Sequence, residues 1–266
     1  MNRMPSGRFL GRKPDIHHAK DLQYAYRPGT RLMGPAPERV DCLAGLQMPQ
    51  IYDQEQEGSC TANSALRWLP WLILRFPDLF GELIPLSRQA QYWWERNLPW
   101  NNDTSEDNGA SIRDIFIVLQ KIGACPEDDD PYRYQTLTVD PGEKAVQDAA
   151  SRRIGPYHRV YTVGDLKDLL SRGWCACLGF NVYPSLDDVG SDGIWNPDPS
   201  RESLAGGHAV FVRGYDDGIN DGSFHIDNSW GTGWGQSGSF WMPYRFLDDY
   251  SASQWDCFTG SPIYRA

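Results

Sequence analysis

Cys60 stands in a sequence setting that suits a nucleophile. It follows Gly58 and Ser59, and it opens a run whose apolar residues recur at helical spacing, at positions 62, 65, 66, 69 and 73. The thiol is therefore expected in the first turn of a helix. The unpaired N–H groups and the dipole at that end lower a thiol pKa from about 8.5 toward neutrality, and an adjacent imidazolium lowers it further. The alternative is a buried structural cysteine.

Two histidines in the second half of the chain could supply the base. In GGHAVFVRGYDD, strand alternation places His208 on one face with positions 210 and 212, and positions 209, 211 and 213 on the other. Gly206 and Gly207 leave the backbone before it open to close approach. His225 lies three residues before Asn228. For a single strand histidine, a hydrogen-bonded structural role is the alternative.

The composition is that of a soluble globular protein. Of 266 residues, 40% are hydrophobic and 23% charged, which is enough apolar material for a large core. The formal net charge of -10 disfavours nucleic-acid binding. No apolar run approaches the ~20 residues that span a bilayer, so no membrane association is expected. The basic N-terminus lacks the apolar core of a secretory signal, so we expect a cytoplasmic location or export without a Sec signal peptide.

The six cysteines, at positions 42, 60, 125, 175, 177 and 257, are expected to be reduced. Cys175 and Cys177 lie two apart in an apolar strand pattern, so both should point to one face and pack as small apolar groups. A zinc site would need further ligands, and none is evident nearby. We expect neither a metal nor a cofactor.

Residues 1–50 are rich in Pro, Gly and charge, and we expect an extended segment that packs on the body of the protein. The adjacent His17 and His18 fall in it and are expected to be solvated. Residues 51–154 are mainly helical. The helix from Cys60 should kink or end near Leu69, because Pro70 removes a backbone hydrogen bond. Further helices are predicted over 86–97, with Ser87 as N-cap, and over 111–123, with Ser111 as N-cap and Gly123 as C-cap.

Residues 155–266 favour strands. Their β-branched and aromatic segments begin near positions 157, 174, 207, 223 and 238, and residues 164–173 are the one segment there that is predicted to be a helix. A helical first half followed by an antiparallel second half indicates an α+β chain with two lobes. Clefts between lobes are preferred positions for active sites.

Three segments together resemble the papain-like cysteine peptidases. They are DQEQEGSCTA around Cys60, the strand of His208, and NSWGTGWGQSGSFWMPY from Asn228; the cysteine and histidine are 148 residues apart and the asparagine follows 20 later. LGRKPD, SCTAN and MPY resemble a microbial branch that often lacks a long inhibitory prosegment. The similarity runs from about residue 10 to the C-terminus. It implies a papain-like two-lobed fold, with a helical first lobe and a β-barrel-like second lobe on either side of the active-site cleft.

The resemblance assigns a role to each residue. Cys60 would be the nucleophile, His208 its partner in a thiolate-imidazolium pair, and Asn228 the group that orients the imidazole. Gln54 would donate to the oxyanion together with the Cys60 N–H, although Gln56 competes for this role.

Further positions follow from the same resemblance. Trp230 would cover the Asn-His hydrogen bond, and it is assigned to substrate binding together with Gly109, Ala110 and Gly207. The chain also departs from the family pattern. Glu57 stands where the family commonly has a disulfide-bonded cysteine, and Thr61 replaces a frequent aromatic residue.

The expected activity is that of a cysteine endopeptidase acting on protein or peptide substrates. Acyl transfer or isopeptide chemistry with the same residues is a second possibility, and a catalytically silent binding module is a third. The sequence does not indicate an oligomeric state.

Overall fold

The computed structural model describes residues 2–15, 21–24 and 36–263, so His17 and His18 lie outside the described residues. Within these ranges the α-helices are α1 Cys60–Arg75, α2 Pro77–Phe80, α3 Arg88–Arg96, α4 Ile112–Lys121, α5 Gly142–Ala149, α6 Val163–Ser171, α7 Tyr244–Asp248 and α8 Tyr250–Ser253. The strands are β1 Asn2–Arg3, β2 Phe9–Leu10, β3 Leu22–Gln23, β4 Arg39–Asp41, β5 Tyr157–Val160, β6 Ala176–Val182, β7 Gly206–Asp216, β8 Ser223–Asp227, β9 Ser239–Pro243 and β10 Asp256–Gly260. Short 3-10 helices cover residues 127–129, 134–136, 150–152 and 184–186.

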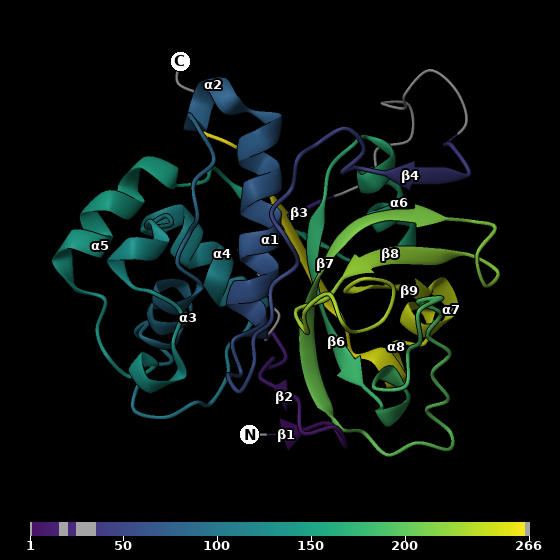
Figure 1. The fold of residues 1–266 in the computed structure, drawn as a ribbon. Coiled ribbons are helices and arrows are strands. Elements are labelled where there is room, and N and C mark those ends of the chain that lie inside the picture. Colours follow the sequence, from purple (N-terminus) through teal and green to yellow (C-terminus); the bar gives the residue numbers. More distant parts are fainter. Residues whose placement is uncertain (1, 16–20, 25–35, 264–266) are drawn as a thin grey trace.

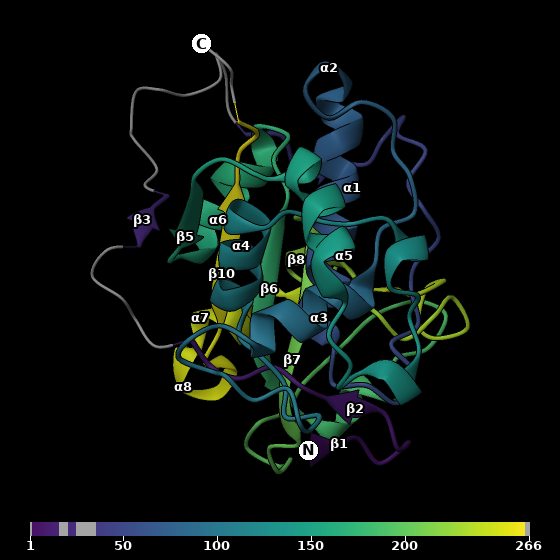
Figure 2. The same cartoon turned by 90° about the vertical axis from the view of Figure 1, so that its left-hand side faces the viewer.

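The helices and the strands occupy different sides of the molecule, which confirms the predicted α+β class. Figure 1 shows α2 to α5 on one side, the long strands on the other, and α1 along the boundary. Helix α1 packs on β6 and β7. Figure 2 shows α4 against β6 and β10, in agreement with the contacts between these elements. The N-terminus of α1 is therefore held beside the central strands.

An eight-stranded sheet is built mainly from the second half of the chain. Its strand order is β3-β5-β10-β6-β7-β8-β9, and β4 pairs with β7. Its pairs are antiparallel except β3 with β5, which run parallel. Strand β7 pairs with β6 from Gly206 to Val212 and with β4 from Gly214 to Asp216. The five strands predicted after residue 155 correspond to β5 to β9. The prediction missed β10, the last strand in the chain.

The described part of residues 1–50 is largely extended and packs on the rest of the protein. β1 and β2 form a small hairpin, and Figure 1 shows it below the N-terminal end of α1. β3 and β4 join the main sheet. Residues 9–12 are buried, which the polar composition around them did not indicate. This part of the chain thus lies close to the predicted nucleophile.

Helix α1 does not end at Leu69. It continues through Pro70 to Arg75, so the prediction that it ends there is wrong. Its residues from Cys60 to Ile73 are all buried. Pro70 cannot donate a hydrogen bond to the Leu66 carbonyl, and the burial of this apolar surface offsets the free energy lost with that bond. One rigid helix therefore carries Cys60 and the core residues of the first lobe.

The predicted caps of α3 and α4 are confirmed at their N-termini. The Ser87 side chain accepts from the Ala90 N–H at 2.9 Å, and Ser111 accepts from the Asp114 N–H at 3.2 Å. At the other end of α4 the cap residue is Ile122, and Gly123 follows it with a φ of +102°. Helix α6 confirms the prediction over 164–173. The prediction of a single helix after residue 155 is wrong, since α7 and α8 also follow it. With five and four residues, these two helices are too short to show helical periodicity in the sequence.

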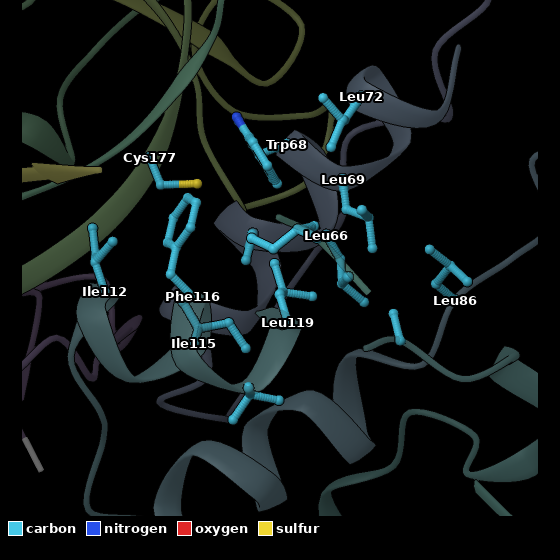
Figure 3. Packing of buried hydrophobic residues seen from close by; sticks show 14 of the residues in the cluster. Leu66, Trp68, Leu69, Leu72, Leu86, Ile112, Ile115, Phe116, Leu119 and Cys177 are labelled. Atoms are coloured by element: carbon cyan, nitrogen blue, oxygen red, sulfur yellow. The ribbon is translucent and has the colours of Figure 1, made fainter. Parts of the chain in front are cut away.

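Two hydrophobic clusters lie on opposite faces of the sheet. One fills the space between α1, α3, α4 and the sheet, and Figure 3 shows Phe116 of α4 beside Cys177 of β6 and near Trp68 of α1. The other cluster lies beneath α6 and α7. Strand β7 alternates as predicted, with Ala209 in the first cluster and Val210 in the second. None of the helices in the described ranges is long and apolar enough to cross a bilayer.

Candidate active site

Cys60 is the first residue of α1 and is completely buried. Backbone N–H groups of Gly11 and Ala209 both interact with its sulfur. The thiol therefore lies where the N-terminal segment, the start of α1 and strand β7 meet. Because Ala209 directly follows His208, this contact also brings the predicted nucleophile and base together.

His208 is held by Asn228, as the resemblance implied. The His208 Nε2 and Asn228 Oδ1 atoms are 2.7 Å apart, and both side chains are buried. Asn228 Oδ1 also accepts from the Ser229 N–H at 2.8 Å, which identifies it as the amide oxygen and makes Nε2 the protonated nitrogen. His208 Nδ1 has no hydrogen-bond partner among the described residues. Its lone pair is thus available for proton transfer.

Trp230 covers this hydrogen bond. Its ring stacks on the His208 ring with the centroids 4.9 Å apart and the planes at 29°. The indole is itself buried, so it excludes water from the Asn228 contact and restricts the rotation of the imidazole. The other strand histidine, His225, stacks on Trp241 at 4.1 Å on β8 and β9, outside the site.

Burial favours the neutral form of both Cys60 and His208. Burial raises the pKa of the Cys60 thiol to about 12 and outweighs the N–H groups of Gly11, Ala209 and Thr61, which lower it. Burial also lowers the pKa of His208 to about 4, although the hydrogen bond that His208 donates to Asn228 raises it. The prediction that the helix terminus lowers the thiol pKa is therefore wrong for this covered state, because desolvation is the larger effect.

Gly11, whose N–H interacts with the Cys60 sulfur, belongs to the N-terminal segment 9–13, which is extended. The Arg12 N–H donates to the Gly207 carbonyl at 3.1 Å, and the Lys13 N–H donates to the Ala110 carbonyl at 2.8 Å. The Ala110 N–H in turn donates to the Gly11 carbonyl at 3.0 Å. Two residues predicted to bind substrate, Ala110 and Gly207, thus hydrogen-bond an extended backbone here.

Gly109, also predicted to bind substrate, permits this close approach. It adopts a φ of +76°, and a Cβ there would overlap the Gly11 carbonyl. A Cβ on Gly11 would overlap the Gly58 carbonyl beside Cys60. The segment and the cleft are therefore in direct backbone contact, with no room for side chains between them.

Gln54 lies in the cleft, whereas Gln56 is exposed to solvent. Gln54 Nε2 donates to the Phe9 carbonyl of the covering segment at 3.2 Å and to the Glu57 carbonyl at 2.8 Å. Its Oε1 accepts from the Ser229 hydroxyl at 2.7 Å, which fixes the orientation of the amide. The geometry favours Gln54 over Gln56 as a donor to a carbonyl oxygen in the cleft.

The two departures from the family pattern, Thr61 and Glu57, are both buried. The Thr61 hydroxyl donates to Glu95 at 2.6 Å, and burial raises the pKa of Glu95 well above its usual value. Burial, followed by the charge of Asp107, raises the pKa of Glu57 to about 7. Asp107 accepts from the Gly58 N–H at 3.0 Å, next to the nucleophile.

The other five cysteines are buried or partly buried. All six are free thiols, and Cys175 and Cys177 are buried in the cluster between α1 and the sheet, as predicted for small apolar groups. No group of three His, Cys, Asp or Glu side chains in the described ranges is placed to hold a metal ion.

The sequence did not single out Arg12 or Asp256, whose side chains form a buried ion pair beside the cleft. They are separated by 244 positions. Nothing in DCFTG distinguishes this aspartate from the other carboxylates of an acidic chain, so no local signal could have identified it.

The fold and the site together define a papain-like cysteine peptidase. The model of the papain family of cysteine proteases matches residues 36–248, and the chain belongs to that family. Among solved structures, xylellain, a cysteine protease from Xylella fastidiosa, is 31% identical with a TM-score of 0.84, and the alignment covers 99% of this chain and 98% of that one. The procathepsin B S9 of Trypanosoma congolense, at 17% identity and a TM-score of 0.72, shares the fold.

Related sequences come from distant sources. A peptidase C1-like protein of Acanthamoeba polyphaga mimivirus is 33% identical over 239 residues, which are 80% of this chain and 72% of that protein. Cysteine proteinase 2 of Entamoeba histolytica is 26% identical over 76% of this chain and 62% of its own length. The family membership makes this chain a hydrolase of the peptidase class.

Proposed function

We propose that this protein is an endopeptidase that cleaves internal peptide bonds of protein or peptide substrates through an acyl-enzyme at Cys60. The observation that carries the proposal is the His208 and Asn228 pair at 2.7 Å, in which Nδ1 of the histidine has no partner among the described residues. The N–H of Ala209, the next residue, interacts with the sulfur of Cys60, which stands at a helix N-terminus. A buried base with one nitrogen fixed and the other free is the arrangement that activates a nucleophile.

The first half of the reaction forms a thioester. Once the covering segment leaves, His208 Nδ1 takes the Cys60 proton, since water and substrate relieve the desolvation that keeps both groups neutral. The Cys60 sulfur then bonds to the peptide carbonyl carbon. As the tetrahedral intermediate collapses, the C–N bond breaks and His208 returns its proton to the leaving amine.

Gln54 would stabilise the charge on the intermediate. Its Nε2 already donates to the Phe9 carbonyl of the segment in the cleft, and a substrate carbonyl in the same place would receive the same hydrogen bond. The Cys60 N–H is the second donor. Water then attacks the thioester, His208 accepts a proton from that water, and the acid product leaves with restoration of the thiol.

Acyl transfer is the second candidate, because an amine can replace water in deacylation with the same residues. Internally quenched peptides mixed with added amine acceptors distinguish the two. We expect fluorescence release with free carboxylate products, and no cleavage by a Cys60→Ala variant. Products joined to the amine in preference to water would instead identify a transferase, and equal cleavage by Cys60→Ala, or none by the wild type, would contradict both.

A further inference from the structure

Two backbone N–H groups beside the site donate to side chains of the helical lobe. The Gly58 N–H, in the loop before the nucleophile, donates to both carboxylate oxygens of Asp107, at 3.0 and 3.2 Å. The Gly109 N–H donates to the Tyr92 hydroxyl at 3.0 Å. Both glycines are buried, so these side-chain oxygens take the place of water as acceptors. The backbone is thereby fixed at two points of the site.

The two acceptor side chains also bond to each other. Tyr92, on α3, is fully buried, and its hydroxyl donates to Asp107 Oδ1. A continuous chain of hydrogen bonds therefore runs from the Gly109 N–H through Tyr92 and Asp107 to the Gly58 N–H. Hydrogen bonds in such a chain strengthen one another in a buried setting. We call this chain the Tyr92–Asp107 bridge.

Arg96 holds the bridge in place from the next turn of α3. Its Nε donates to the Tyr92 carbonyl at 3.1 Å, and its guanidinium carbon lies 4.2 Å from the centre of the Tyr92 ring. Its Nη1 donates to the carbonyl of Glu106, the residue before Asp107, at 2.6 Å. Both members of the bridge are thus oriented before any substrate binds.

The two ends of the bridge meet different parts of the reaction. The Gly58 end fixes the loop that leads into Cys60, whose N–H is the second donor to the oxyanion in the proposed mechanism. The Gly109 end fixes the residue before Ala110, whose N–H and carbonyl hydrogen-bond the extended segment 9–13 at 3.0 and 2.8 Å. An extended substrate would use these same two Ala110 groups.

Hydrogen bonds, and not a disulfide, anchor the loop before the nucleophile. Glu57, next to Gly58, stands where the family commonly has a disulfide-bonded cysteine, and all six cysteines of this chain are free thiols. Loss of a buried acceptor here would leave an N–H group unpaired, which is costlier than the loss of an ordinary surface hydrogen bond.

We propose that Asp107 and Tyr92 are positioning residues for the peptidase reaction, in which Asp107 holds the nucleophile loop and Tyr92 holds the backbone that binds the substrate. The inference rests on the proposed peptidase function. Because the two ends are separate, the two side chains should control different kinetic constants: Tyr92 the binding of the peptide, and Asp107 the chemical step.

The test compares Tyr92→Phe and Asp107→Ala by steady-state kinetics on one internally quenched peptide. Both are made in Arg12→Gln protein, because segment 9–13 occupies the same Ala110 groups and its anchor to Asp256 must be weakened. We expect Tyr92→Phe to raise KM about 10-fold with kcat nearly unchanged, and Asp107→Ala to lower kcat about 10- to 100-fold. Asp107→Asn keeps an acceptor oxygen for the Gly58 N–H and should recover most of the lost kcat.

Tyr244→Phe is the matched control, because it removes another hydroxyl that donates to a carboxylate, that of Asp217 at 2.8 Å. It should leave both constants unchanged. A bridge with a structural role alone would lower the urea midpoint and leave KM and kcat of the folded protein unchanged, which would overturn this inference.

If Asp107→Ala fails to fold, Tyr92→Phe decides by itself, and an unchanged KM contradicts the proposal. Absence of Cys60-dependent cleavage by the Arg12→Gln parent would instead overturn the proposed function, and this inference with it.

Discussion

Cys60 and His208 are both buried, and burial decides which charge state each group favours. It raises the thiol pKa to about 12 and lowers the His208 pKa to about 4, so the neutral pair is favoured across the physiological range. The Cys60 position at a helix N-terminus becomes effective only when the desolvation is relieved. The same two residues can therefore be inert or reactive without any change in their bonding partners on α1 and β7.

Substitution of Gln54 tests the oxyanion donor. Gln54→Ala removes the amide that donates to a carbonyl in the cleft, so kcat should fall about 10²- to 10³-fold with a small change in KM. Gln56→Ala is the matched control, since this exposed glutamine makes no contact in the cleft, and it should leave kcat unchanged. Steady-state kinetics on one peptide substrate measures both. Equal effects of the two substitutions would argue against this role.

Glu57 should make stability depend on pH. Burial and Asp107 raise its pKa from 4.5 to about 7, so the folded protein binds this proton more tightly than the unfolded chain does. The stabilisation is complete below about pH 4.5 and is lost as the pH rises through about 7. Between about pH 5 and 8, the free energy of unfolding of the wild type should therefore fall relative to Glu57→Gln, by up to about 3 kcal/mol. Urea unfolding at both pH values measures this, and parallel pH profiles would contradict it.

At the scale of elements, the segment 9–13 behaves as an added strand across the cleft, held by backbone hydrogen bonds to Ala110 and Gly207. Gly11→Ala should displace it, because the new Cβ would overlap the Gly58 carbonyl. We expect the rate of Cys60 alkylation to rise at least about 10-fold as the thiol becomes accessible. Gly164→Ala on α6 is the control, where the nearest atom lies 3.8 Å away. An unchanged rate in Gly11→Ala would show that the segment does not limit access.

Local patterns predicted most elements because their signals are local. Apolar spacing and the Ser87 and Ser111 caps define α3 and α4, and β-branched residues define the strands. Pro70 led to the wrong prediction that α1 ends near Leu69. The burial of α1 in the folded protein outweighs the one missing hydrogen bond, and this burial cannot be predicted from the local sequence. The short α7 and α8 carry too few residues for a helical period to appear.

At the scale of the whole molecule, a buried ion network joins the helical half to the sheet. Asp227 of β8 binds Arg67 of α1 at 2.8 Å and Arg213 of β7 at 3.3 Å. Asp227→Ala would leave both guanidinium groups without this partner and should lower the free energy of unfolding by about 3–5 kcal/mol. It should also lower activity, because Asn228 is the next residue.

The control for this change is Asp217→Ala, which breaks a partly exposed pair with Lys167 and should cost about 0–1 kcal/mol. Chemical denaturation of the three proteins gives the comparison. Similar midpoints for Asp227→Ala and the wild type would mean that the network contributes little to joining the two halves.

The candidate site was only partly predictable from the sequence, because some of its contacts join distant parts of the chain. Cys60, His208, Asn228 and Gln54 lie in distinctive local strings, and the structure pairs His208 with Asn228 and places Gln54 against Ser229, the next residue. The covering of that cleft by residues 9–13, and the pairing of Arg12 with Asp256, depend on contacts between the two ends of the chain. Such contacts leave no periodicity or motif, and a single sequence does not reveal them.

The proposed mechanism makes Cys60 a nucleophile that His208 activates once residues 9–13 leave the site. Its most direct test is the rate of epoxide alkylation of each cysteine in Gly11→Ala protein at about pH 6, resolved by mass spectrometry. We predict that Cys60 reacts about 100-fold faster than the half-buried Cys42, because a thiolate paired with imidazolium persists at a pH where an ordinary thiol is protonated. Reaction of Cys60 no faster than that of Cys42 would contradict the claim.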